Sequence, residues 1–200
     1  MTTVRQIERL WTSQQFPQLL AALLHGRPES ATTLRTATRS PLPVAAIILI
    51  RLDELSQSHV PLYARLVKFL LAAQEPDGGW TDPLTTALCL RALLAGGGSG
   101  DAIDRGIGYL ASLQKPDGLW PLEPLRRMPA DATVSAFILL QLGGHRRFVE
   151  AIRFDQVLKW FQSRDGTLDP TVQQLWEHAS LRCRLHGLGA ADAQTELSWS

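Results

Sequence analysis

The sequence predicts an all-α protein built from α/α hairpin repeats, and a repeated segment is the main reason. Three stretches, residues 69–80, 109–120 and 157–168, each start with an apolar residue, carry glutamine at the sixth position and have Asp-Gly at the ninth and tenth. The first two also share a proline and end in tryptophan. Self-similarity of this kind is typical of repeat architectures. The chain is therefore expected to be a series of similar helical units.

A helix is predicted before each repeated segment, because apolar residues recur there on one stripe at helical spacing. In two successive units these residues are Leu62, Leu66, Phe69, Leu70 and Ala73, and then Ile103, Ile107, Leu110 and Leu113. The Pro-Asp-Gly that follows breaks the helix, since proline fixes φ and glycine supplies an unusual backbone angle. Each stripe should face the interior of its unit.

A second helix is predicted after each break, at residues 83–95, 131–142 and 170–186, with a similar one at 41–55. Two of them follow Asp-Pro, which is typical of an N-cap residue and a proline in the first helical turn. The repeating unit is therefore helix, turn, helix, and no strand pattern competes with it. Four units at about 7–55, 61–95, 101–142 and 147–188 make a single domain of residues 1–200. The first lacks the motif and the last has Leu168 in place of tryptophan, as expected of terminal repeats.

Composition argues against several classes of protein. Twenty basic and 19 acidic residues give a net charge of +1, which offers no field to attract nucleic acid or an anionic membrane. No apolar run approaches the roughly 20 residues of a membrane-spanning helix, and no signal peptide is recognised. With only two cysteines, Cys89 and Cys183, a reduced cytoplasmic protein is expected.

The glutamine, Asp-Gly and tryptophan motif resembles the QW repeat of the terpenoid cyclase and protein prenyltransferase superfamily. The resemblance is good over residues 61–142 and weak elsewhere. It implies an (α/α) toroid, or an open segment of one. In such a fold, Gln74 with Trp80 and Gln114 with Trp120 would hold adjacent hairpins together. The family ring closes with about six hairpins, whereas this chain has room for about four. An open array, or one completed by a second chain, is therefore expected.

The resemblance also offers a catalytic candidate. Cyclases that protonate an alkene or epoxide carry Asp-x-Asp-Asp-Thr at the start of an inner helix, and the middle Asp is the acid. Asp131 and Thr133 match that Asp and Thr, but proline and alanine replace the flanking acids. The alternative is that Asp131 is a helix N-cap, because Asp82 and Asp169 stand at comparable helix starts.

No metal site or cofactor is expected. The family's zinc-binding subunits use an Asp, a Cys and a His, but Thr85 stands where the histidine should be. Cys89 is expected to be a small buried residue. His178, Cys183 and His186 do not share one face of their helix. No phosphate-binding loop or nucleophile motif is present.

Two functions remain in view. The favoured one is a non-catalytic binding or assembly module whose apolar concave face holds a hydrophobic, isoprenoid-like ligand or a partner helix. Residues predicted to line that face are Leu84, Leu88, Val134, Phe137 and Trp176. The alternative is a reduced cyclase with Asp131 as general acid. Because an open array leaves apolar flanks, self-association or a partner chain is expected to cover its ends.

Overall fold

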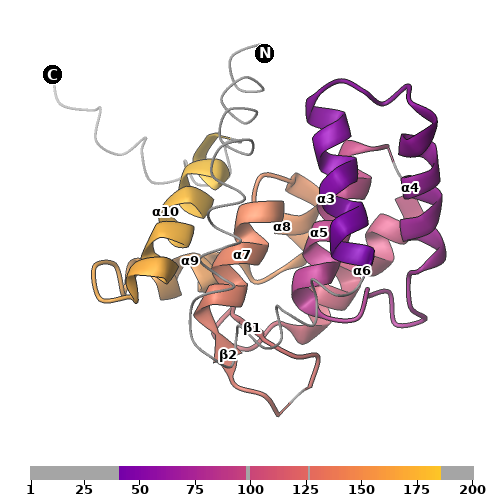
Figure 1. Cartoon of the computed structure of the whole chain (residues 1–200). Helices are drawn as coiled ribbons and strands as arrows, with labels where there is room; N and C mark the ends of the chain where they lie inside the picture. The colour runs from indigo at the N-terminus through magenta and orange to yellow at the C-terminus, as the bar shows by residue number, and fades with distance from the viewer. Residues whose placement is uncertain (1–40, 98–99, 126, 186–200) are drawn as a thin grey trace, which may run out of the picture.

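The computed structural model describes residues 41–97, 100–125 and 127–185. Within these ranges the regular structure consists of eight α-helices and one very small sheet, which confirms the all-α prediction (Figure 1). The first predicted unit is described only from residue 41 onward. The sequence also predicts one amphipathic helix from Trp11, Phe16, Leu19, Leu20 and Leu23, and this segment lies outside the described residues, as does His186.

Four helices pack side by side in sequence order and form what we call the core row. They are α3 (Pro41–Glu54), α5 (Pro83–Ala95), α7 (Ala132–Leu142) and α10 (Pro170–Leu185). These bounds agree within one residue with the second helices predicted from sequence. In Figure 1 the row runs from α3 on one side of the molecule to α10 on the other. Nearly every side chain of α5 and α7 is buried, as expected of helices that are apolar all round.

The remaining helices flank the row. They are α4 (Pro61–Ala72), α6 (Gly100–Leu113), α8 (Arg146–Ala151) and α9 (Phe154–Gln162). Helix α4 packs on α3, α6 packs on α5, and α8 contacts α6. Helices α4 and α6 thus accompany α3 and α5 of the core row, and Phe161 of α9 stacks on Trp176 of α10, so the helices form two layers.

Local sequence explains where the core-row helices begin and end. Helix α5 starts after Asp82, whose carboxylate accepts a hydrogen bond from the Thr85 N–H, and Pro83 occupies its first turn. The helix ends at Gly96, whose N–H bonds to the Ala92 carbonyl. Helix α7 ends in the same way at Gly143.

The expectation that no strand competes was wrong in one place. Strand β1 (Trp120–Pro121) pairs antiparallel with β2 (Ala130–Asp131), so that Trp120 lies opposite Asp131. Two residues per strand are too few to leave an alternating pattern in the sequence. The pairing closes the loop that separates the motif tryptophan from the start of α7.

None of the helices in the described ranges is long and apolar enough to cross a bilayer.

Candidate functional site

The repeated motif forms a compact turn at residues 74–80 and again at 114–120, which we call the motif turns. In the first, Gln74 Nε2 donates to the Gly78 carbonyl at 2.9 Å, and the Asp77 carboxylate accepts from the Gly79 N–H at 2.9 Å. Gly78 has φ +94°, a region that glycine enters without steric cost. The second turn repeats this geometry, with 2.7 Å from Gln114 to Gly118 and φ +85° at Gly118.

The motif glutamines reach from one unit into the next. Gln74 Nε2 donates to the Ala102 carbonyl of α6 at 2.8 Å, and its Oε1 accepts from Arg105 Nη2 at 2.5 Å. Gln114 Oε1 accepts from the backbone N–H of Arg153 at 2.6 Å, and Arg153 Nη1 donates to the Gln114 carbonyl at 3.3 Å. Each glutamine thus connects its own turn to the flanking helix that follows.

The motif tryptophans join the two helices of their own unit. Trp80 and Trp120 are both 0% exposed. Their indole N–H groups donate to Leu70 and Leu110 carbonyls, each at 2.8 Å, near the end of the preceding flanking helix. Their backbone N–H groups donate at 2.9 Å to hydroxyl oxygens in the first turn of the following core-row helix. A buried indole with its N–H paired is a strong packing element.

Asp131 is the N-cap of α7. Its carboxylate accepts from the Val134 N–H at 3.0 Å, and its carbonyl accepts from the Ser135 hydroxyl at 2.7 Å. Asp82 occupies the same place in the preceding unit and accepts from the Thr85 N–H at 2.9 Å and the Thr85 hydroxyl at 2.7 Å. Burial raises the pKa of Asp82, and the bonds from Thr85 and Leu84 partly offset this. In the last unit, the Asp169 carboxylate accepts from the Thr171 N–H at 3.0 Å.

The cap at Asp131 gives a direct stability prediction. Asp131→Ala should lower the free energy of unfolding by about 1 kcal/mol, because the Val134 N–H loses its partner. Asp131→Asn retains an accepting oxygen and should cost less. Urea denaturation followed by circular dichroism measures both. Asp155→Ala is the control, since Asp155 is exposed in the first turn of α9 and is not its cap. Equal effects at Asp131 and Asp155 would show that the cap contributes nothing.

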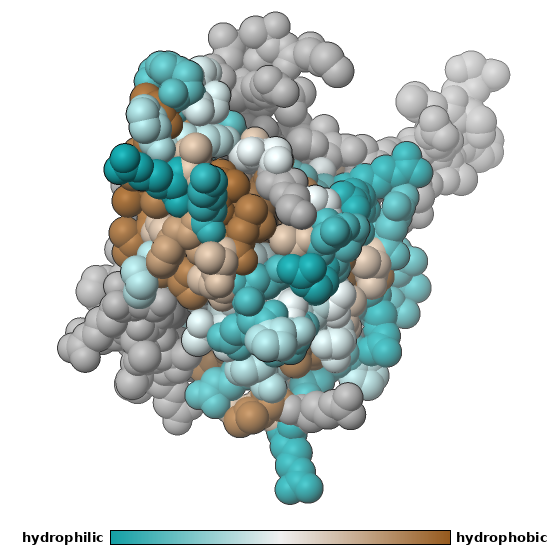
Figure 2. Space-filling model, turned by 90° about the vertical axis from the view of Figure 1, so that its right-hand side faces the viewer, coloured by the Kyte–Doolittle hydropathy of each residue, from teal (hydrophilic) through white to brown (hydrophobic). Residues whose placement is uncertain are grey.

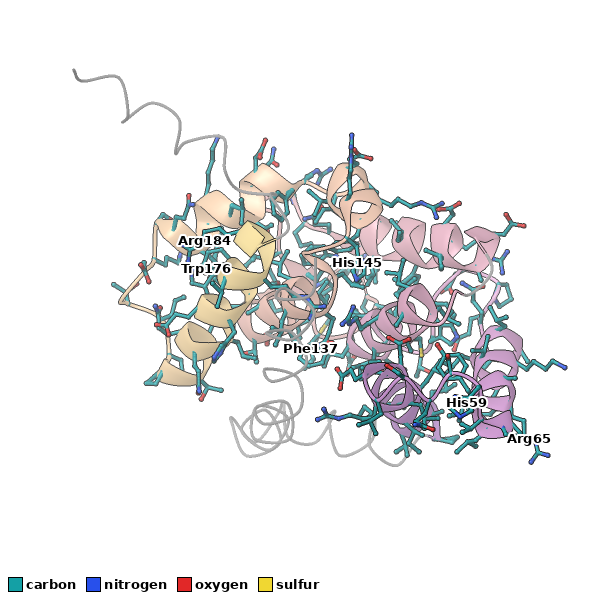
Figure 3. All side chains as sticks on the ribbon, turned by 90° about the horizontal axis from the view of Figure 1, so that it is seen from above. His59, Arg65, Phe137, His145, Trp176 and Arg184 are labelled. Carbon is teal, nitrogen blue, oxygen red and sulfur yellow. The ribbon has the colours of Figure 1, made fainter. Side chains whose placement is uncertain are left out.

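The residues predicted to line an apolar face are buried within the array. Leu84 and Leu88 are each 4% exposed, and Val134 and Phe137 each 2%. Trp176 is 6% exposed and stacks on Phe161 of α9, with ring centroids 4.5 Å apart. Figure 3 places Phe137 in the interior, between the helices. In this structure all five side chains contribute to packing between helices.

Both cysteines are free and buried. Burial raises the pKa of the Cys89 thiol, and the charge of Asp82 adds to that effect. Burial likewise raises the pKa of Cys183 to about 12. Among the described residues, no group of three or more His, Cys, Asp or Glu side chains is placed to hold a metal ion.

Sequence reasoning missed the arginines that join the units. Arg105 and Arg153 contact the motif glutamines, as described above, and the buried Arg182 of α10 donates to the Leu140 carbonyl of α7 at 3.0 Å. A signal was available for the first two, because each lies nine residues before the next motif glutamine. Nothing in the local pattern marks Arg182.

One flank of the array carries exposed apolar side chains, which we call the α3–α4 flank. Its members are Val44 and Ile48 of α3 and Leu62 and Phe69 of α4, which are 38–48% exposed. Figure 2 looks at this side of the molecule and shows apolar surface gathered beside a mostly hydrophilic area. Exposed apolar groups that cluster in this way are typical of interaction surfaces.

Comparison with known proteins gives one partial similarity. The chain is 28% identical over 116 residues to squalene–hopene cyclase from Alicyclobacillus acidocaldarius, a match that covers 53% of this chain and 18% of the cyclase. No family model matches the chain, and no solved structure matches it. At the level these findings support, the chain is a helical protein similar to a short part of a terpenoid cyclase.

Proposed function

We propose that the chain is a non-catalytic binding or assembly module that holds a partner protein through apolar surface on its helical array. The observation that carries this proposal is the distribution of apolar side chains. The candidates for a ligand-binding face are buried by packing between helices; they are Leu84, Leu88, Val134, Phe137 and Trp176. Apolar side chains on the α3–α4 flank stand exposed instead. Burial of the first set and exposure of the second favour a partner helix over a small hydrophobic ligand.

The environment of Asp131 supports the same proposal. A carboxylic acid that protonates an alkene must be kept protonated in an apolar pocket. Asp131 is instead partly exposed, and its carboxylate accepts a hydrogen bond from the Val134 N–H as the cap of α7. Its counterpart Asp82 makes the equivalent bonds. A residue that repeats the role of its counterpart in another unit is adequately explained as a cap.

The second candidate is a reduced cyclase in which Asp131 is the general acid and an isoprenoid is the substrate. The partial similarity to squalene–hopene cyclase favours it, as does the position of Asp131 at the start of a core-row helix. Thr133, the other residue that matches the cyclase pattern, lies in the first turn of the same helix.

An assay for cyclisation separates the two candidates. Purified full-length protein is incubated with squalene in detergent micelles, and the extract is analysed by gas chromatography and mass spectrometry. We expect no cyclised product from the wild type, from Asp131→Asn or from Asp82→Asn. Native mass spectrometry of the wild type should show polypeptide without a copurified isoprenoid.

The matched Asp82→Asn variant makes the opposite result interpretable. Product formed by the wild type and by Asp82→Asn, but not by Asp131→Asn, would overturn the non-catalytic proposal and identify Asp131 as the acid. An isoprenoid that copurifies with the wild type would likewise contradict the preference for a protein partner.

A further inference from the structure

An arginine lies nine residues before each motif glutamine. The pairs in sequence are Arg65 and Gln74, Arg105 and Gln114, and Arg153 and Gln162. In space, however, Gln74 and Gln114 each meet the arginine of the following unit. The Arg105 guanidinium donates to the Gln74 side chain, whereas the Gln114 side chain accepts from the backbone N–H of Arg153, whose guanidinium donates to the Gln114 backbone carbonyl. The junction between units is therefore a glutamine from one and an arginine from the next.

This pairing leaves one half of a junction at each end of the described array. Arg65 is exposed on α4, and Gln162 is exposed at the end of α9. Neither side chain makes a hydrogen bond or an ion pair with any other residue in the described ranges. Figure 3 shows Arg65 pointing away from the molecule, on the side opposite to Trp176 and Arg184 of α10. The two unpaired groups are complementary and lie far apart.

The turn beside Gln162 shares the left-handed glycine of the motif turns but not their glutamine contact, because Gln162 is still part of α9 and does not bond to the Gly166 carbonyl. Gly166 has φ +75°, close to the values at Gly78 and Gly118. A Cβ at Gly78 would lie 2.5 Å from the Arg105 carbonyl oxygen, and one at Gly118 would lie 2.4 Å from the Val157 nitrogen. A Cβ at Gly166 would meet nothing within 4 Å. The last turn therefore leaves open the space that a following flanking helix occupies elsewhere.

Apolar surface accompanies the unpaired Arg65. Arg65 lies between Leu62 and Phe69 on α4, and both of these side chains are exposed. The junctions between units within the chain also combine polar and apolar contacts, since the polar contacts of the motif turns border buried apolar helix surfaces.

We propose that a second copy of this chain docks head to tail, with its α4 seated on the 162–166 turn and its Arg65 bonded to Gln162 of the first copy. This rests on the proposed assembly function and names its partner. A second copy is the favoured occupant because the chain itself carries both halves of the junction, at opposite ends. Such a contact is heterologous, so it repeats until the copies close a ring or continue as a filament.

Sedimentation velocity of the full-length protein over a wide concentration range tests the proposal. The wild type should self-associate with rising concentration. Gln162→Arg places two arginines opposite each other at the junction, and Arg65→Glu removes the hydrogen-bond donor. Each variant should weaken association about tenfold, as expected for the loss of a hydrogen bond to a charged group. The double variant Arg65→Glu/Gln162→Arg places opposite charges at the junction and should regain association. Lys68→Glu, an equal charge change one turn along α4, should associate like the wild type.

Mixing the single variants tests the direction of docking. Arg65→Glu retains a native Gln162 end, and Gln162→Arg retains a native Arg65 end, so their mixture should associate more tightly than either variant does alone. A symmetric dimer through one face would gain nothing from mixing. Thermal melts followed by circular dichroism confirm that each variant is folded.

Several outcomes would overturn the proposal. The first is a wild type that stays monomeric at every concentration. That result is expected if residues 1–40 cover the α3–α4 flank of their own chain. Association that neither single variant weakens would also refute it. Failure here is distinguishable from failure of the proposed function, because cyclisation of squalene would refute the non-catalytic role without affecting the sedimentation result.

Discussion

Replacing Trp120 with alanine is expected to lower the free energy of unfolding by about 3–5 kcal/mol, the range for truncating a large buried aromatic side chain. Trp120 is 0% exposed and stacks on Phe148, with ring centroids 6.1 Å apart. Its indole N–H donates to the Leu110 carbonyl at 2.8 Å. The substitution therefore opens a cavity between helices and leaves a buried carbonyl without its donor, and the second loss adds to the first.

Trp160→Ala is the matched control for this prediction. Trp160 is only partly buried on α9, where its ring contacts Phe161 and the Arg164 guanidinium lies 4.3 Å from its centroid. Its removal should cost about 1 kcal/mol, which is typical of a substitution outside the core. Urea denaturation followed by far-ultraviolet circular dichroism measures both variants. If Trp120→Ala costs no more than Trp160→Ala, the motif tryptophan is not a principal packing element.

The helices of the array could be predicted from sequence because their signals are local. Pro83 after Asp82, and Gly96 after the last turn, mark the start and end of α5 within a few residues. The same kind of signal located α3, α7 and α10. Asp131 was recognised as a possible cap because Asp82 offered a comparison within the chain, but only the bond to the Val134 N–H identifies the cap directly.

The contacts between units could not be predicted in the same way. Gln74 and Arg105 are 31 positions apart, and Gln114 and Arg153 are 39 apart. No local pattern connects such residues, because they meet only after the hairpins pack. The apolar residues of the core row present a related difficulty. Their spacing predicts that Leu84 and Phe137 are covered, but it does not say whether a ligand or another helix covers them.

Gly118→Ala should lower the free energy of unfolding by about 2–5 kcal/mol, and the reason lies at a junction between units. The left-handed backbone at φ +85° costs a residue with a side chain about 1–2 kcal/mol. The new Cβ would also lie 2.4 Å from the Val157 nitrogen and 2.9 Å from the Gln156 carbonyl carbon. These are backbone atoms of the next flanking helix and cannot swing aside like the end of a side chain, so overpacking adds about 1–3 kcal/mol.

Gly166→Ala provides a control with the same backbone cost and no clash. Its φ is +75°, and a Cβ there meets nothing within 4 Å. It should therefore cost only about 1–2 kcal/mol in denaturation of dilute, monomeric protein. An equal loss of stability at both glycines would mean that α9 moves away from a Cβ at Gly118 at no cost in free energy.

If a second copy docks on the 162–166 turn, Gly166→Ala should in addition weaken self-association in sedimentation. Its Cβ would meet α4 of that copy, as a Cβ at Gly118 meets Val157. The same substitution then reports monomer stability at low concentration and the junction between copies at high concentration.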